Sequence, residues 1–230
     1  MKIKFCFFGK NCVIDRALSN RNDLAQKLAN QGFVHDHLLL LNQIHSNEVV
    51  IIDAPEKIYG AQNLPKADAL VTNLKNVVIG VVTADCAPIL LMDEEKEIIA
   101  AIHAGWRGAR FGIINSTIAA MKNLGAKNVK AIIGPMIQQK SYEISQEFFD
   151  DFLAEDLDNK KFFLNAEKAG HYWFDLPSYV EKKLRLAGVK KIENQQIDTY
   201  ENEEKFFSFR RSSKRGEKDC GRNVSVISLN

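Results

Sequence analysis

The hydrophobic positions over the first two thirds of the chain form short apolar runs rather than long helical patterns. Runs of about four to eight apolar residues, bounded by polar or turn-forming residues, favour buried strands. They predict strands at Ile3–Phe8, Leu38–Leu41, Glu48–Asp53, Ala69–Thr72, Val77–Thr83, Ile89–Met92 and Ile98–Ile102. Further strands are predicted at Val129–Ile133, Phe206–Arg210 and Val224–Ile227. The polar tetrad Asp93-Glu94-Glu95-Lys96 separates two of these runs, which predicts a hairpin.

Apolar residues at the helical spacing predict four helices between the strands. These helices are expected at Asn20–Gln31, Ala109–Leu124, Gln146–Leu153 and Leu176–Leu186. Ser145 and Asp175 stand where helix-capping residues are preferred, and Gly125 and Gly188 stand where helices commonly end. The order of elements is not a regular alternation of strand and helix, and no GxGxxG or Walker loop is present. We therefore predict a single α+β (layered α/β) domain over residues 1–230, with a mixed β-sheet flanked by helices.

The composition of the chain mainly excludes classes of partner and of targeting segment. The 230 residues are 46% hydrophobic and 26% charged, with a net charge of +2, so no overall field favours nucleic acid or an anionic membrane. No apolar run approaches the roughly 20 residues that cross a bilayer. The N-terminus lacks the small-residue cleavage site of a signal peptide, and the four cysteines show no paired spacing. We expect a cytoplasmic protein with reduced thiols, which is a monomer or a small homo-oligomer.

Three segments carry reactive residues at the ends of predicted strands. They are Asn42-Gln43-Ile44-His45-Ser46, Val81-Val82-Thr83-Ala84-Asp85-Cys86 and Ala101-Ile102-His103-Ala104-Gly105-Trp106-Arg107-Gly108. Two imidazoles and one thiolate, from His45, Cys86 and His103, make a ligand set that suits Zn²⁺ with its fourth position open, as in catalytic zinc sites. The spacing matches no zinc-finger signature. A single cysteine or histidine in such a position is more often a buried core residue.

Together these segments belong to a longer succession of motifs. It includes Ala67-Asp68-Ala69-Leu70-Val71-Thr72, Thr83-Ala84-Asp85-Cys86-Ala87-Pro88, Ile133-Gly134-Pro135, Ser141-Tyr142-Glu143-Ile144 and Phe206-Phe207-Ser208-Phe209-Arg210-Arg211. The succession closely resembles the YfiH family, also called the laccase-domain or multicopper polyphenol oxidoreductase family, over about residues 42 to 222. This chain departs from the family pattern in having Ser46 where glycine is usual and Asp198 where cysteine is usual.

The resemblance implies a fold shared with a deamidating toxin domain of the CNF type and a mononuclear metal site on His45, Cys86 and His103. It also implies purine nucleoside phosphorylase activity on adenosine, inosine and methylthioadenosine, with phosphate as co-substrate and ribose 1-phosphate as product. An adenosine deaminase side activity is implied as well. Zinc is the expected metal, and copper is possible.

Phosphorolysis needs a phosphate clamp and stabilisation of the leaving base. Arginine can bind phosphate through two parallel hydrogen bonds, and carboxylates can orient metal-binding imidazoles. We expect catalytic roles for Cys86, His103, Arg107 and Asp85. The substrate and phosphate are expected to contact Asn42, Gln43, Arg107, Arg210, Arg211 and Asp68. We expect no nucleic-acid or membrane partner.

Three alternatives stay open. The first is a copper-dependent phenol oxidase with Met92 or Met136 as axial ligand, although five histidines are too few for an additional multinuclear copper cluster. The second is a metal-free hydrolase in which His103 activates the Cys86 thiol. The third is a structural zinc domain that acts as a binding module.

Overall fold

The computed structural model describes residues 3–12 and 21–230, so the predicted helix start at Asn20 lies outside the described residues. The strands are β1 Ile3–Phe8, β2 His37–Leu39, β3 Val49–Ile52, β4 Ala69–Thr72, β5 Val77–Thr83, β6 Ala87–Asp93, β7 Ile98–Ala104, β8 Lys130–Ile133, β9 Glu143–Ser145, β10 Phe163–Asn165, β11 His171–Phe174, β12 Lys191–Asn194 and β13 Asn223–Leu229. The α-helices are α1 Arg21–Asn30, α2 Trp106–Phe111, α3 Ile113–Asn123, α4 Gln146–Glu155, α5 Leu176–Leu186 and α6 Phe209–Lys214. Short 3₁₀ helices lie at Pro55–Lys57, Gln139–Ser141 and Leu157–Phe162.

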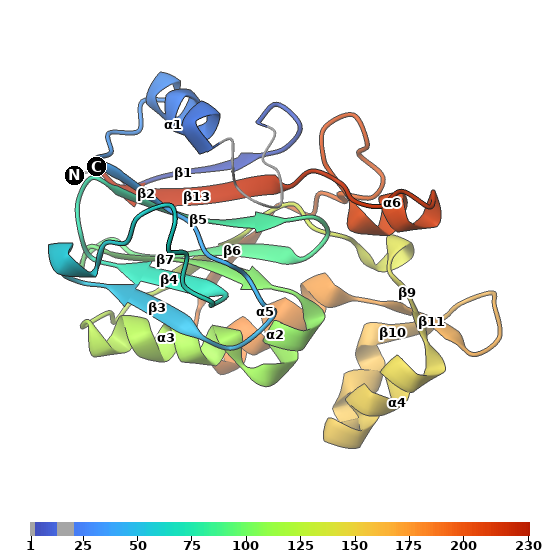
Figure 1. The fold of residues 1–230 in the computed structure, drawn as a ribbon. Coiled ribbons are helices and arrows are strands. Elements are labelled where there is room, and N and C mark those ends of the chain that lie inside the picture. Colours follow the sequence, from blue (N-terminus) through green and yellow to red (C-terminus); the bar gives the residue numbers. More distant parts are fainter. Residues whose placement is uncertain (1–2, 13–20) are drawn as a thin grey trace.

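Two mixed sheets form the centre of the molecule, stacked between helices (Figure 1). A four-stranded sheet has the order β1-β13-β5-β2, and a six-stranded sheet has the order β12-β8-β6-β7-β4-β3. Helix α1 covers the outer face of the first sheet, while α3 and α5 cover the outer face of the second. A small sheet, β10-β11-β9, lies to one side with α4. The predicted α+β class with mixed sheets and flanking helices is confirmed.

Apolar side chains fill the space between each pair of layers. Residues from both sheets, among them Ile79, Leu90 and Ile99, form the cluster between the sheets, and all three are fully buried. Alternate residues of the same strands, such as Ile89 and Ile102, point to α3 and α5 on the other face. Both faces of β6 and β7 are therefore buried, which is why these strands appear as continuous apolar runs in the sequence. Rigid strands of this kind are well suited to holding side chains at their ends.

The predicted hairpin of β6 and β7 is confirmed, and the buried carboxylate of Asp93 closes it. The two strands pair antiparallel, with Asp93 opposite Ile98. Asp93 Oδ1 accepts the N–H groups of Glu95 and Lys96, and Oδ2 accepts those of Lys127 and Asn128 at 2.7 and 2.8 Å. These four backbone hydrogen bonds lower the pKa of Asp93 although burial opposes them. One carboxylate thus joins the hairpin turn to the segment before β8.

The predicted helix at Ala109–Leu124 is wrong in one respect, because the structure divides this region into two helices. Gly112 adopts φ of +95°, which ends α2 and begins α3 in a new direction. Phe111 consequently points away from the core and is 59% exposed, although the helical spacing places it with the buried residues of α3. The glycine signal at position 125 is confirmed, since Gly125 has φ of +102° after the end of α3.

The predicted strand at Phe206–Arg210 is also wrong. Ser208 caps α6 there by accepting the N–H of Arg211, and the helix begins at Phe209. Both edges of the neighbouring strand β13 already pair, with β1 and β5, so this segment cannot pair with β13. The short strands β9, β10, β11 and β12 were not predicted. Three of them, β9, β10 and β12, contain at most two apolar residues in a row, so they give no apolar run.

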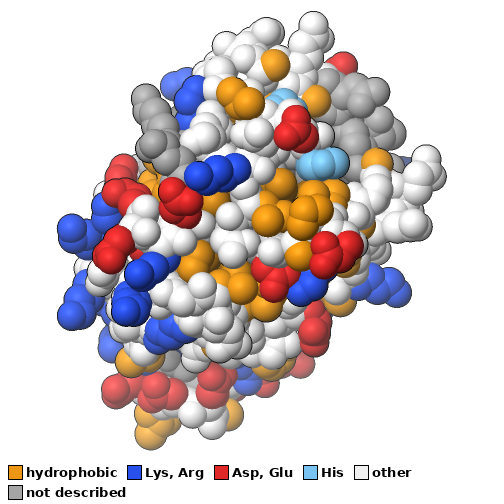
Figure 2. Space-filling model, turned by 90° about the vertical axis from the view of Figure 1, so that its left-hand side faces the viewer, with side chains coloured by type: hydrophobic (Ala, Val, Ile, Leu, Met, Phe, Trp, Pro, Cys, Tyr) orange, Lys and Arg blue, Asp and Glu red, His pale blue; other side chains and the backbone are white. Residues whose placement is uncertain are grey.

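The face that carries the two chain ends shows acidic and basic side chains interspersed around a group of apolar ones (Figure 2). The intermixed charges agree with the near-neutral net charge of +2. Within residues 3–12 and 21–230, no helix combines the length and the apolar character that a membrane crossing requires.

We expect Asp93→Asn to lower the free energy of unfolding by about 2–4 kcal/mol at pH 7, because the new amide group meets two N–H donors. The native pKa of Asp93 lies below the value of about 3.9 in an unfolded chain. Its contribution is therefore complete above that value and is lost as the pH falls through the native pKa. Urea unfolding of both proteins from pH 7 to pH 3 should show the difference shrinking. The control Glu94→Gln breaks an exposed pair with Lys130 and should cost less than about 1 kcal/mol. An equal cost for both variants would contradict this role.

Candidate metal centre

Three side chains from separate parts of the chain meet beside the ends of the central strands. His45 lies in the loop between β2 and β3, Cys86 between β5 and β6, and His103 in β7. Their potential ligand atoms all lie within 4.8 Å of one another, and Cys86 Sγ is 3.9 Å from His45 Nε2. Around a tetrahedral zinc ion such atoms would be roughly 3.3–3.6 Å apart. The donor set therefore fits one ion after small side-chain shifts, with a coordination position left over.

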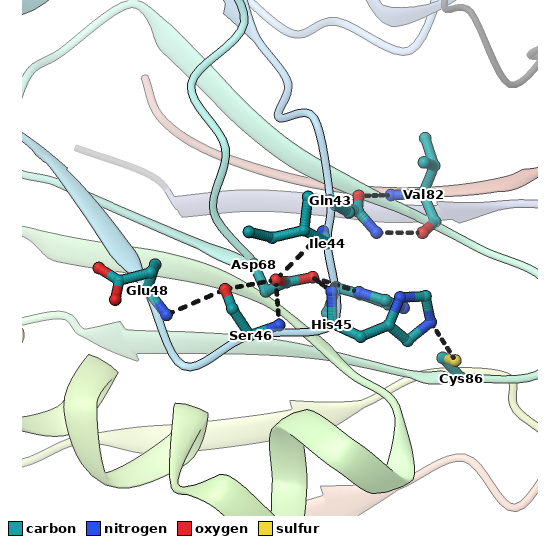
Figure 3. A network of polar contacts seen from close by, with 9 residues as sticks. Gln43, Ile44, His45, Ser46, Glu48, Asp68, Val82 and Cys86 are labelled. Carbon is teal, nitrogen blue, oxygen red and sulfur yellow. Dashed lines mark hydrogen bonds and ion pairs between the residues drawn. The ribbon is translucent and has the colours of Figure 1, made fainter.

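The buried carboxylate of Asp68 organises two of these three side chains (Figure 3). Asp68 Oδ1 lies 2.8 Å from His103 Nδ1, and a carboxylate can only accept there, so Nδ1 carries the proton. The other ring nitrogen, Nε2, is thereby left free to bind a metal. The same carboxylate accepts the backbone N–H groups of Ile44, His45 and Ser46, and the Ser46 hydroxyl at 2.8 Å. Asp68 thus holds the His45 loop against the strand that carries His103.

Unusual backbone geometry occurs at the same place. His45 has φ of +59° and Asp85 has φ of +88°, a region that residues with a side chain rarely adopt. A Cβ at Gly105 would lie 3.0 Å from both Cys86 Sγ and His45 Cδ2. Gly105 therefore makes room for the proposed ligands themselves.

The pKa values of Cys86 and His103 move in opposite directions because the two groups attract each other. Burial alone raises the pKa of Cys86, but the imidazoles of His103 and His45 outweigh it and lower that pKa to about 6. Burial alone lowers the pKa of His103, but the Cys86 thiolate and Asp68 raise it to about 9. The pKa of Asp68 falls to about 2 despite burial, through hydrogen bonds from His103 and Ser46. Cys86 is thus held as a thiolate, the form that binds metals.

Two cavities meet at His45 and Cys86 and share His45, Ala84, Cys86 and Phe209 in their walls, while His103 lines only the second. The first, here called the basic cavity, has a volume of about 500 Å³ and is also lined by Trp106, Tyr142, Arg210 and Lys214. The second, here called the amide cavity, has a volume of about 810 Å³ and is also lined by Asn42, Gln43, Gln62, Thr83 and Arg222. A small molecule has room on either side of the proposed metal position.

Of the three arginines expected to bind phosphate, only Arg210 lines the basic cavity. Its guanidinium lies over the ring of Tyr142 and donates to the Glu143 carbonyl at 2.7 Å. Arg211 is buried, and its guanidinium donates to the backbone carbonyls of Thr199, Tyr200 and Phe206. That network leaves Arg211 a structural role.

Arg107 is exposed and lies over the ring of Trp106, 5.0 Å from its centroid. It is not among the lining residues of either cavity. The glycine-flanked segment from Gly105 to Gly108 therefore brings Trp106, not Arg107, to the basic cavity.

The other predicted residues occupy the site with different roles. Asp85 does not reach the imidazoles. Its oxygens accept Thr199 Oγ1, Ser208 Oγ and the N–H of Arg210, which ties the start of α6 to the Cys86 loop. Burial raises the pKa of Asp85. Asp68 is fully buried beneath the proposed ligands, so it orients them and does not contact substrate.

Asn42 and Gln43 both line the amide cavity, but their contacts differ. The Gln43 amide both donates to and accepts from the backbone of Val82, at 2.7 and 2.8 Å, and so fastens the His45 loop to β5. Asn42 is exposed, and its backbone pairs with Lys66.

Sequence analysis missed several lining residues, namely Thr83, Tyr142, Phe209, Lys214 and Arg222. Thr83, Tyr142 and Phe209 stand within the recognised motifs, which was the available signal. Met92 lies at the far end of β6 from Cys86, roughly 20 Å away along a strand, so it cannot be an axial ligand. Met136 is fully buried in the core and lines neither cavity.

Known proteins share the sequence and the fold of this chain. Residues 14–230 match the family model described as multi-copper polyphenol oxidoreductase laccase. A purine nucleoside phosphorylase from Rickettsia prowazekii is 46% identical over 180 residues, which is 78% of this chain and 73% of that protein. The structure of protein NMB0706 from Neisseria meningitidis superimposes with a TM-score of 0.76 at 31% identity, covering 91% of this chain and 81% of that one. YfiH from Bacillus licheniformis gives a TM-score of 0.79 at 27% identity, covering 91% and 80%.

We expect Asp68→Asn to weaken zinc binding by about 10- to 100-fold, because His103 loses the acceptor that fixes its tautomer. Zinc affinity is measured by competition with a chromophoric chelator, alongside the melting temperature of the metal-free protein. The exposed Asp36→Asn variant serves as the control and should bind zinc like the wild type. Wild-type affinity in a folded Asp68→Asn protein would show that Asp68 does not act through the ligands.

Proposed function

Because this chain belongs to the multi-copper polyphenol oxidoreductase laccase family and its three-ligand site opens onto two cavities, we propose that it is a zinc-dependent purine nucleoside phosphorylase. Its substrates would be purine nucleosides, among them adenosine, inosine and methylthioadenosine, together with phosphate. The activity printed in the names of relatives such as the Rickettsia prowazekii protein supports the reaction class. The observation that carries the proposal is the convergence of His45, Cys86 and His103 beside a cationic cavity wall.

Arg210 is the residue we assign to phosphate. A guanidinium carries five N–H donors, and the one hydrogen bond to Glu143 leaves others for a ligand. Stacking on Tyr142 and the hydrogen bond from its own N–H to Asp85 fix the position of Arg210 in the cavity wall. A phosphate held in a fixed orientation loses little entropy on the way to the transition state, which favours attack on the sugar.

The remaining site residues would orient and shield the reaction. Asp68 holds the Nδ1 proton of His103, and Gly105 permits the close approach of Cys86 and His45. Trp106 packs on Phe148, with ring centroids 4.8 Å apart, and closes one side of the basic cavity against water. A zinc ion bound here would supply positive charge and an open coordination position to a substrate oxygen.

Zinc suits the donor set better than a multicopper centre. All five histidines lie in the described part of the chain, and only His45 and His103 belong to a cluster that could hold a metal. Four-electron reduction of dioxygen requires a histidine-rich multinuclear copper cluster, and the ligands for one are lacking. We therefore do not propose a phenol oxidase activity.

We expect the purified protein to release free hypoxanthine from inosine when phosphate or arsenate is present, and not when both are omitted. Cys86→Ala should abolish base release and lower bound zinc together, because the thiolate is one of three ligands. Cys6→Ala, on β1 in the other sheet, is the matched control and should keep both. Base release by Cys86→Ala at the wild-type rate would rule out the proposed site.

A lesser adenosine deaminase activity at the same site is also proposed. Deamination would require C6 of the purine, and not C1′ of the ribose, to approach the metal position. We expect ammonia release from adenosine without phosphate, and its loss in His45→Ala and His103→Ala along with bound zinc. Ammonia release that persists in both variants would assign the activity to a different site or to a contaminant.

A further inference from the structure

The two cavities at the metal centre present unsatisfied polar groups of different kinds. In the basic cavity, Arg210 and Lys214 have no carboxylate partner within ion-pair distance among the described residues. Several other arginines are paired, for example Arg110 with Glu155. Two cations in one wall that make no ion pair among the described residues favour an anionic ligand. Asp85 lines the same cavity and interacts electrostatically with Arg210, but both of its oxygens accept hydrogen bonds, one of them from the backbone N–H of Arg210.

The amide cavity has neutral unsatisfied groups. Thr83 is one of the residues that line this cavity. Its hydroxyl has almost no accessible surface and no hydrogen-bond partner among the described residues, so a ligand reaches it only after the side chain rotates. Thr83 is 1% exposed, and an orphaned buried hydroxyl costs about 1–3 kcal/mol, which a ligand can recover. The side-chain amides of Asn42 and Gln62 also line this wall, and amides of this type pair well with the edges of purines. The arginine of this cavity, Arg222, is already paired with Asp219.

The chemistry of a single-displacement phosphorolysis requires two subsites on opposite sides of the sugar. The nucleophile approaches the anomeric carbon from the face opposite to the leaving group. A phosphate oxygen bonds to C1′ while the bond from C1′ to N9 breaks, its electron pair going to the purine. The proton of hydrogen phosphate ends on the purine, so ribose 1-phosphate and free base form without another reactant.

We propose that the basic cavity is the phosphate subsite and the amide cavity is the nucleoside subsite, with C1′ at their boundary beside Cys86 and Phe209. This assignment rests on the phosphorylase activity proposed above. Phe209 is 57% exposed and lines both cavities, so its ring faces the position where the sugar would lie. Lys214, which comes from the last turn of α6, is thereby a phosphate ligand together with Arg210.

The first arm of the test removes the charge of Lys214 and leaves the packing of Arg210 unchanged. Lys214→Met in the zinc-loaded protein should raise the KM for phosphate about tenfold and change the KM for inosine less than twofold. Lys218→Met removes an exposed lysine that lines neither cavity and should change neither KM. Lys214→Gln, which keeps a polar side chain, should behave like Lys214→Met.

The second arm removes the orphaned hydroxyl. Thr83→Val should raise the KM for inosine at least fivefold with an unchanged KM for phosphate. The same change should raise the melting temperature, because it deletes a buried polar group that the empty site leaves unpaired. A purely structural threonine would not show opposite effects on stability and on nucleoside binding.

Titration calorimetry separates this proposal from the activity. Inorganic phosphate and inosine are titrated separately into zinc-loaded wild type, Lys214→Met and Thr83→Val. Loss of phosphate binding in Lys214→Met alone, and of inosine binding in Thr83→Val alone, supports the assignment even if turnover fails. The reverse pattern, equal effects on both ligands, or unchanged binding of both overturns it. Absence of base release by wild type would overturn only the phosphorylase activity.

Discussion

The hydrogen bond between Asp68 and His103 is the interaction on which the rest of the site depends. A buried carboxylate is costly unless it is fully hydrogen-bonded, and Asp68 meets this requirement by gathering donors from two separate segments. The same contacts hold His45 at a positive φ and leave the Nε2 atom of His103 facing Cys86. Ser46 adds a hydroxyl donor to this carboxylate. Asp68 therefore fixes both the strained backbone of His45 and the tautomer of His103.

Asp85 plays a comparable part on the other side of Cys86. It follows the end of β5 and adopts a positive φ, and it draws in donors from Thr199, Ser208 and Arg210, which lie more than a hundred positions away along the chain. The loop that carries the thiolate and the helix that carries the cationic wall are thus fastened together. Rigid strands supply the positions of the proposed ligands, and two buried carboxylates join the loops to them. Preorganisation of this kind is what an active site requires.

Much of the sheet was predictable because buried strands give local signals, and the three proposed ligands were identified because they stand within the motifs of the recognised family. Buried strands such as β4 and β5 appear as bounded apolar runs, and His103 stands out because a polar residue ends such a run. The break at Gly112 was less visible, since the apolar spacing continues across it. The roles of neighbouring arginines were not predictable at all. Which of Arg210 and Arg211 faces the cavity depends on the Ser208 cap and on a contact with distant Asp85.

The geometry also bears on whether Cys86 is a ligand or a nucleophile. A carboxylate bound to one ring nitrogen of a histidine whose other nitrogen faces a thiol is the arrangement of a cysteine hydrolase, and Asp68, His103 and Cys86 reproduce it. A catalytic pair of this type needs one imidazole. Here a second, that of His45, lies 3.9 Å from the same sulfur, in a strained conformation that several hydrogen bonds maintain. Such strain persists only where the surrounding contacts enforce it. A second imidazole held in this way has a clear purpose in a metal centre and none in a thiol–imidazole pair, which favours metal binding by Cys86.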